Sequence, residues 1–389
     1  MDIQLYFKPI IQPKEDNVNF NSDQLGSVIK GYFHEDEFPD VTGMDIALIG
    51  VGEDRNSIHN HGCAEGPNAI REQLYSLYKG PNTPKIIDLG NINIGHSTDD
   101  TYYAVTNIMV ELLRINVIPI IIGGSQDICW AMYKAYEQLN QVINIAAVDR
   151  MFDLGKNEDE LNSEQYLHKM IMSEPNFLFN YSNIGYQTYL VSQLGIDLMK
   201  KLFFDTYRLG WVRQHLEEVE PMVRNADMMS IDISSVRQSD APGNCNPRAN
   251  GFYSEELCQI ARYAGMSDKM TSFGIFEVNP KLDSLNQTSS LAAQAIWYFV
   301  DGFYARRKDY PLVAKDDYIK YIVSIKTQTY EIIFFKSKKS DRWWMEIPYV
   351  LKNKNIERHH LVPCSYNDYL IACNDEVPDR WLQFYSKFQ

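Results

Sequence analysis

Four short polar stretches, each following an apolar run, hold the side chains of this sequence that could do chemistry. They read "GGSQD" (123–127), "VDRMFDLG" (148–155), "SIDISS" (230–235) and "FEVNP" (276–280). Taken alone, each has a simple structural explanation, such as a helix cap for Asp127 or a loop shaped by Asp149 and Asp153. Four polar strand ends in succession favour a shared site, because ligands of parallel sheets bind beyond the carboxyl ends of the strands.

The apolar runs predict the elements that must position these stretches. Their near-continuous hydrophobicity is typical of strands buried on both faces. The predicted strands are 45–51, 85–90, 117–123, 143–149, 228–234 and 271–278, and amphipathic helices are predicted at 66–79, 101–116 and 253–266. Strands that alternate with helices predict an α/β domain built on a mostly parallel sheet.

Composition excludes several classes of partner and compartment. The chain has 389 residues and a net charge of -14, which repels phosphate backbones and anionic lipid, so we expect neither nucleic acid nor a membrane as partner. No apolar run approaches the roughly 20 residues of a membrane span, and the first residues lack the pattern of a signal peptide, so we expect a cytoplasmic protein. The six cysteines form no CxxC pair and are expected to be reduced thiols.

The order of segments over about residues 44–305 resembles the ureohydrolases, the family of arginase, agmatinase and formimidoylglutamase. The resemblance begins in "GVGEDRNSIHNHGCAEGPNAIR" (50–71) and is strongest in "SIDISSVRQSDAPGNCNPRANGFYSEE" (230–256). It implies a three-layer arginase-like α/β fold with a mostly parallel central sheet. It also implies hydrolysis of a guanidino or formimino group by a hydroxide that bridges two manganese ions.

The stretches that resemble the metal motifs of this family depart from them at three of six ligand positions. "GGSQD" resembles Gly-Gly-Asp-His-Ser and carries Gln126 in place of the first histidine. "DRMFD" resembles Asp-Ala-His-x-Asp, keeps Asp149 and Asp153, and carries Met151 in place of the second histidine. "DIS" resembles Asp-x-Asp, keeps Asp232 and carries Ser234 in place of the second carboxylate.

The resemblance therefore implies at most one metal ion, held by Gln126, Asp149, Asp153 and Asp232. This all-oxygen set suits Mg²⁺ or Ca²⁺, and Mn²⁺ less selectively, so we do not expect a dimanganese pair. Without an ion, the clustered aspartates need a proton or a basic side chain to offset their repulsion. Arg150 adjoins Asp149, but strand alternation predicts that it points to the other face of the sheet.

Two further residues occupy positions with a role in the family. Glu277 corresponds to the glutamate that receives the guanidinium in arginases and agmatinases; as a simple alternative, its carboxylate caps a turn. Asp149, Asp232 and Glu277 are accordingly the candidate catalytic positions, and Glu277 is the candidate substrate ligand. His168 lies near the place of a proton-shuttling histidine, but the surrounding pattern differs and indicates a helix-surface residue.

Segments outside the resemblance are interpreted as extensions. We assign 1–40 to an N-terminal extension, 41–309 to the ureohydrolase-like domain and 310–389 to a C-terminal extension. In the last, "YIKYIVSI" and "YEIIFFKSK" predict paired strands, and Trp343 and Trp344 look exposed. His359, His360 and Cys364 have no standard zinc spacing. From the resemblance and the two tryptophans we expect a homo-oligomer, a trimer or a hexamer.

Two functions from different classes remain open. The first is a non-catalytic ureohydrolase relative, retained for binding or assembly. The second is an active hydrolase of a linear amidine C–N bond in a guanidino or formimino compound, which would use one metal ion or none. The departures at Gln126, Met151 and Ser234 favour the first.

Overall fold

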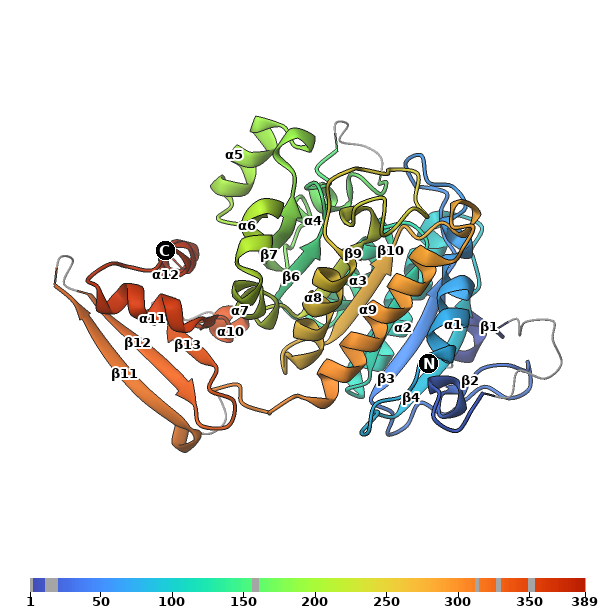
Figure 1. Ribbon diagram of the computed structural model, residues 1–389, viewed down its shortest axis with the longest axis horizontal. Helices are drawn as coiled ribbons and strands as arrows, with labels where there is room; N and C mark the ends of the chain where they lie inside the picture. Colours follow the sequence, from blue (N-terminus) through green and yellow to red (C-terminus); the bar gives the residue numbers. More distant parts are fainter. Residues whose placement is uncertain are drawn as a thin grey trace.

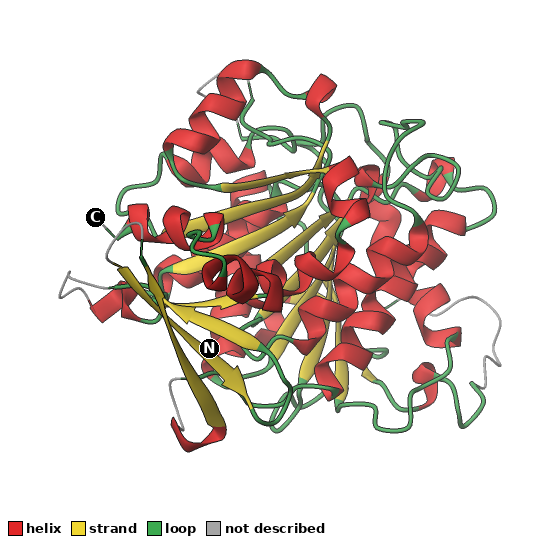
Figure 2. Cartoon of the chain, turned by 60° about the vertical axis from the view of Figure 1, so that its left-hand side comes forward, coloured by secondary structure: helices red, strands yellow, loops and turns green. Residues whose placement is uncertain are grey.

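A computed structural model describes residues 3–10, 20–155, 161–311, 315–326, 330–348 and 354–388. Its main body is a ten-stranded sheet between two layers of helices, with the strand order β1-β4-β3-β5-β10-β9-β6-β7-β8 and β2 beside β4 (Figures 1 and 2). The strands are β1 (Phe7–Lys8), β2 (Lys30–Gly31), β3 (Ile46–Val51), β4 (Ile86–Ile92), β5 (Ile118–Gly123), β6 (Ile143–Val148), β7 (Leu178–Tyr186), β8 (Asp205–Arg208), β9 (Met228–Asp232) and β10 (Ser272–Phe276).

All pairings in this sheet are parallel except that of β1 with β4. The three-layer, mostly parallel arrangement agrees with the predicted fold class. Each of the six strands predicted from the sequence is present within a few residues of its expected ends. Strands β7, which spans most of the aromatic-rich stretch 177–189, and β8 were not among the predicted strands.

Helices cover both faces of the sheet because each face buries its own apolar cluster. One cluster lies under α1 (Gly66–Ser76), α7 (Val219–Arg224), α8 (Ser254–Met266) and α9 (Gln287–Tyr304). The other lies under α2 (Thr98–Arg114), α3 (Ile128–Gln138), α4 (Tyr166–Ile171) and α5 (Gln193–Lys201). The short helix α6 (Leu209–Gln214) follows β8 at the edge of the sheet. None of the helices in the described part of the chain combines the length and apolar character of a membrane span.

The C-terminal residues form a second, four-stranded antiparallel sheet with its own apolar cluster. Its strands are β11 (Tyr318–Ile325), β12 (Tyr330–Ser337), β13 (Trp343–Glu346) and β14 (Leu361–Cys364), accompanied by α10 (Lys354–Glu357), α11 (Tyr366–Cys373) and α12 (Asp379–Lys387). The pairing of β11 with β12 confirms the predicted hairpin. In Figure 1 this sheet lies at the opposite end of the molecule from α1.

Trp343 and Trp344 are buried, with 7% and 1% of their surfaces exposed, so the expectation that they are exposed was wrong. Strand β13 is an inner strand between β12 and β14, and both of its faces are covered. The ring of Trp344 lies under the guanidinium of Arg224, 4.4 Å from its carbon, on the side that faces the main body. A pair of adjacent tryptophans can be buried on opposite faces of one strand, which the sequence pattern alone does not indicate.

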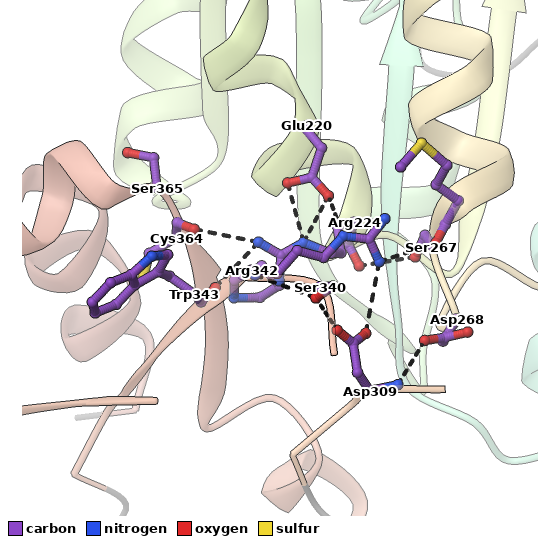
Figure 3. Close-up of polar contacts among 12 residues, drawn as sticks. Glu220, Arg224, Ser267, Asp268, Asp309, Ser340, Arg342, Trp343, Cys364 and Ser365 are labelled. Atoms are coloured by element: carbon purple, nitrogen blue, oxygen red, sulfur yellow. Dashed lines mark hydrogen bonds and ion pairs between the residues drawn. The ribbon is translucent and has the colours of Figure 1, made fainter. Parts of the chain in front are cut away.

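A polar network joins the C-terminal sheet to α7 of the main body (Figure 3). Glu220 accepts from Arg224 at 2.9 Å and from Arg342 at 3.3 Å, and Arg342 also lies 3.7 Å from Asp309. Arg224 donates to the carbonyl oxygens of Trp343 and Cys364. The main chain of β13 and β14 is therefore hydrogen-bonded to an arginine of the larger sheet's helical layer.

Candidate functional site

The four polar stretches lie at the carboxyl ends of four neighbouring strands, β5, β10, β9 and β6. The sheet order places the ends of these strands side by side even though they are far apart in sequence. Side chains from all four ends meet at one small cavity, whose lining includes Gln126, Arg150, Met151, Asp153, Asp232 and Glu277. The structure thus brings together the residues singled out from the sequence.

The "GGSQD" loop needs its second glycine because it passes close to another loop. A Cβ atom at Gly124 would lie 2.1 Å from the carbonyl oxygen of Glu53. Asp127 directly precedes α3, but its carboxylate makes no capping hydrogen bond to the helix, so the expectation that it is a helix cap was wrong. It accepts instead from the hydroxyls of Ser125 and Tyr102, and burial raises the pKa of Asp127 to about 6.

Gln126 is fully buried and directs its amide nitrogen at the carboxylate of Asp149. Its Nε2 donates to Asp149 Oδ2 at 3.0 Å and lies 3.2 Å from the hydroxyl of Tyr166 and 3.3 Å from that of Ser230. The backbone N–H of Gln126 donates to Glu277 Oε1 at 2.8 Å. Gln126 therefore donates hydrogen bonds to the carboxylates of Asp149 and Glu277. Its Nε2 occupies a position next to Asp149 Oδ2, an oxygen that would otherwise be free to bind a metal ion.

Glu277 is held by Asn60, which lies between β3 and α1. Its Oε2 accepts from Asn60 Nδ2 at 2.7 Å, and the same nitrogen donates to the backbone oxygen of Glu277 at 3.0 Å. Glu277 has a φ of 67° and Asp153 a φ of 49°, which are left-handed conformations that residues other than glycine adopt infrequently. Asn60 was not predicted from the sequence as a site residue, although it lies in a segment that resembles the family.

Arg150 points into the site, so the expectation that it faces the other side of the sheet was wrong. Strand β6 ends at Val148, and alternation no longer applies two residues later. The Nε of Arg150 donates to Ser234 Oγ at 2.9 Å, and Nη2 lies 3.9 Å from a carboxylate oxygen of Glu164. Ser234 in turn donates through its hydroxyl to Asp232.

Burial raises the pKa values of the clustered carboxyl groups, neighbouring carboxylates raise them further at Asp153, Asp232 and Glu277, and Arg150 opposes the rise at the three aspartates. Burial and then Asp149 raise the pKa of Asp232 to about 7, and burial and then Asp232 raise the pKa of Glu277 to about 8. Burial and Asp149 hold the pKa of Asp153 well above its ordinary value. The charge of Arg150 lowers the pKa values of Asp149, Asp153 and Asp232. The guanidinium therefore serves as a counter-charge to all three aspartates.

The donor groups present do not fit a pair of manganese ions. Three of the six positions implied by the resemblance carry Gln126, Met151 and Ser234; the amide of Gln126 and the hydroxyl of Ser234 are hydrogen-bonded to Asp149 and Asp232. A thioether and a neutral hydroxyl are poor ligands for a hard cation. Among the described residues, no group of three or more His, Cys, Asp or Glu side chains is arranged to hold a metal ion. Asp153 Oδ2 is buried without a hydrogen-bond partner in that part of the chain.

The histidines considered from the sequence lie away from this cavity or outside its lining. His168 is half-buried on α4. His359 is buried and stacks on Phe179, with ring centroids 4.5 Å apart, while Nδ1 of His360 lies beside the backbone oxygen of Glu357. Cys364 is buried in the apolar cluster of the C-terminal sheet.

The sequence of this chain is similar to those of known proteins. Residues 44–301 match the model of the Arginase family. The chain is 26% identical over 283 residues to the formimidoylglutamase of Bacillus subtilis, which covers 67% of this chain and 88% of that protein. It is 25% identical over 282 residues to the formimidoylglutamase of Streptococcus gordonii, covering 66% and 84%.

Solved structures show the same fold at lower identity. The Bacillus subtilis formimidoylglutamase aligns with a TM-score of 0.67 at 20% identity, covering 76% of this chain and 97% of that one. The formiminoglutamase of Trypanosoma cruzi, crystallised with Mn²⁺, aligns with a TM-score of 0.65 at 20% identity, covering 73% and 99%. The proclavaminate amidino hydrolase of Streptomyces clavuligerus aligns with a TM-score of 0.62 at 20% identity, covering 74% and 98%.

Proposed function

The chain belongs to the arginase family, and from this premise we propose that it is a non-catalytic member, retained for binding or assembly. In this proposal the site at the strand ends does not carry out two-metal hydrolysis and is closed by the chain's own Arg150. The observation that carries the proposal is the hydrogen bond of 2.9 Å from Arg150 Nε to Ser234 Oγ.

This hydrogen bond joins two positions at which the sequence departs from the family motifs. The resemblance aligns Arg150 with an alanine and Ser234 with a metal-binding carboxylate. A permanent cation has thus been added where a negative ligand has been removed. A guanidinium beside the aspartates supplies the charge that a metal ion would otherwise supply, and repels a second cation.

The size of the cavity supports the same proposal. The space that its lining leaves for the centre of a water molecule is about 10 Å³. One water needs about 10 to 15 Å³ measured in this way. A guanidino or formimino group would therefore have to displace side chains to enter this cavity from the adjoining one of about 460 Å³, with which it shares Met151, Asp153 and Glu164.

The extent of the similarity favours a second candidate function. This chain covers 88% of the length of the Bacillus subtilis formimidoylglutamase, and Glu277 lies at the cavity with one carboxylate oxygen bound by Asn60. The alternative is an active hydrolase of a formimino or guanidino C–N bond that uses one Mg²⁺, Ca²⁺ or Mn²⁺ ion, or none. In that case a substrate amidine would bind near Glu277 after Arg150 had moved.

One experiment separates the two candidates. Purified protein is dialysed, its metal content is measured, and release of urea, ammonia and formamide is followed with N-formiminoglutamate, arginine and agmatine, with and without Mn²⁺. We expect no bound manganese pair and no release above the rate without enzyme, while the Bacillus subtilis formimidoylglutamase serves as the positive control. Turnover that is abolished by Glu277→Gln would overturn the proposal in favour of the hydrolase.

A further inference from the structure

A second, much larger cleft lies along the β8 edge of the main sheet. Strand β8 and helix α6 form one of its sides, and helices α11 and α12 form the other. Its volume is about 1230 Å³, and it shares no lining residue with the cavity at the strand ends. A hydrogen bond links the two sides: Gln383 Nε2, on α12, donates to the backbone oxygen of Phe203, which precedes β8. Figure 1 shows α12 next to α6 in this region.

One wall of the cleft is the open edge of the ten-stranded sheet. Strand β8 is the last in the sheet order, and within the described chain it pairs only with β7. A terminal strand presents N–H and C=O groups on its free side, and an extended peptide can satisfy them by adding as a further strand. Asp205, Thr206, Tyr207 and Arg208 form this strand, and all four line the cleft.

The same wall continues into a ladder of aromatic rings. Tyr207 lies in β8, Trp211 lies in α6 and His215 directly follows that helix, and their rings stack one after another. The centroids of Tyr207 and Trp211 are 5.3 Å apart and those of Trp211 and His215 are 4.9 Å apart, and both pairs are stacked. Trp211 is 38% exposed. An exposed indole face attracts a lysine or arginine side chain.

Carboxylates outnumber cations around the cleft. Its lining holds six Asp and Glu side chains against three Lys and Arg side chains. Arg380 is already paired, 3.8 Å from Glu218 and 3.7 Å from Asp368. Glu217, Glu376 and Asp379 are exposed, and none of them has an ion pair within the described residues. The potential in the cleft therefore favours a positively charged occupant.

Asp205 places a buried carboxylate behind this wall. Only 6% of the surface of this residue is exposed. Its Oδ2 accepts hydrogen bonds from Asn180 Nδ2 at 2.6 Å and from Ser182 Oγ at 2.9 Å. Its Oδ1 has no hydrogen-bond partner in the described structure. Because this oxygen is itself shielded from solvent, Asp205 adds negative charge behind the wall and no direct contact for a bound segment.

We propose that this cleft binds an extended, basic segment of polypeptide, which adds as a strand to the free edge of β8. The segment's main chain pairs with β8, its lysine or arginine side chains lie on the ladder of Tyr207, Trp211 and His215, and the free carboxylates at the rim neutralise them. The proposal goes beyond the one for the strand-end site and does not depend on whether that site is active.

The test uses fluorescence anisotropy with the full-length protein and a fluorescein-labelled peptide of alternating lysine and valine. Three comparison peptides are a glutamate–valine peptide, a lysine–valine peptide methylated on alternate backbone nitrogens, and a lysine–valine peptide methylated on the other set. We expect the unmethylated basic peptide to bind with a Kd of about 100 μM or below at low salt. The acidic peptide and at least one methylated peptide should bind at least about tenfold more weakly, because strand addition needs backbone donors.

Matched variants separate this cleft from the general negative charge of the protein. Glu217→Gln, Glu376→Gln and Asp379→Asn together remove three charges from the rim and should weaken binding about tenfold. Asp36→Asn, Glu37→Gln and Glu72→Gln remove three exposed charges elsewhere and should change it less than about twofold. Trp211→Leu should weaken binding without changing the melting temperature appreciably.

Three outcomes would overturn the proposal. The first is no binding of the unmethylated basic peptide. The second is binding of both methylated peptides as tightly as the unmethylated one, together with displacement of the basic peptide by spermidine at the same concentration as by unlabelled peptide; this result would identify a site for small organic cations. The third is an equal loss of affinity in the two triple variants, which would show that the peptide responds only to net charge.

Discussion

The Nε of Arg150 lies 2.9 Å from Ser234 Oγ, and this contact connects the ends of two neighbouring strands, β6 and β9, across the candidate site. The hydroxyl of Ser234 in turn donates a hydrogen bond to Asp232. A basic side chain is thereby built into a cluster of buried carboxyl groups, and its charge makes their ionisation less unfavourable.

Removing this guanidinium should destabilise the protein. Arg150 is buried and opposes the charges of Asp149, Asp153 and Asp232. Leaving such charges without their partner typically costs about 3 to 5 kcal/mol, so we expect a loss of that size in the free energy of unfolding of Arg150→Met. Urea denaturation at pH 7 measures it. Arg150→Lys, which keeps the charge, should lose less. Equal stability of Arg150→Met and the wild type would show that protonation alone balances the cluster.

Rebuilding the family's ligand pattern should create a manganese site, provided that Arg150 is also removed. The variant combines Gln126→His, Met151→His and Ser234→Asp with Arg150→Ala. Because Mn²⁺ would bind the folded state, it should stabilise this variant by about 2.7 kcal/mol at a hundredfold excess over its dissociation constant. Differential scanning fluorimetry with and without Mn²⁺ measures the expected rise in melting temperature.

The same three ligand substitutions with Arg150 retained serve as the control and should respond more weakly to Mn²⁺. A variant that folds normally but shows no Mn²⁺-dependent rise in melting temperature would mean that the strand ends do not converge closely enough for two ions.

Lys269 should make stability depend on pH. It is buried, its Nζ lies 3.8 Å from a carboxylate oxygen of Asp227 and 3.4 Å from His359 Nδ1, and Arg358 is paired with the same aspartate. Burial lowers the pKa of Lys269 to about 7, whereas its ordinary value is 10.5. Between these values the unfolded chain binds more protons than the folded one, so stability rises with pH.

The substitution Lys269→Met should abolish this rise of stability with pH. Relative to the variant, the wild type should gain up to about 1.4 kcal/mol per pH unit between about pH 7 and pH 10. Chemical denaturation at several pH values measures the difference, with Lys85→Met at an exposed position as the control. A difference that does not change with pH would contradict the assigned environment of Lys269.

Trp344 should contribute strongly to stability. Its side chain is fully buried between the C-terminal sheet and the main body, beneath Arg224. We expect Trp344→Ala to lower the free energy of unfolding by about 3 to 5 kcal/mol. The exposed Tyr103, on α2, provides a control, because Tyr103→Ala should change stability by less than about 0.5 kcal/mol. A small effect at Trp344 would indicate that the C-terminal sheet does not pack on the main body in solution.

The oligomeric state remains a prediction based on the family resemblance alone. Because Trp343 and Trp344 are buried within the chain, they no longer support an intersubunit contact. We still expect a trimer or a hexamer, and multi-angle light scattering at micromolar concentration should give a multiple of 45.1 kDa. A mass equal to the single chain would refute it.

The sequence by itself determined the layered α/β architecture. Buried parallel strands need continuous apolar residues, and this requirement made six of them, such as β5 and β9, visible as short hydrophobic runs. The glycines and polar residues after the runs marked the end of the sheet at which a site would form. Strand β8 escaped prediction because it is a four-residue edge strand with polar and charged residues, "DTYR", which no apolar pattern reveals.

Only the tertiary structure decided where the side chain of Arg150 points. The local sequence predicts a side chain's direction only while the strand continues, and Arg150 lies past the end of β6, where the turn of the backbone carries it toward Ser234, 84 residues away along the chain. The burial of Trp344 and the open edge of β8 likewise depend on which elements pack against each other. Such packing arises from contacts between distant segments, and a pattern of neighbouring residues contains no information about them.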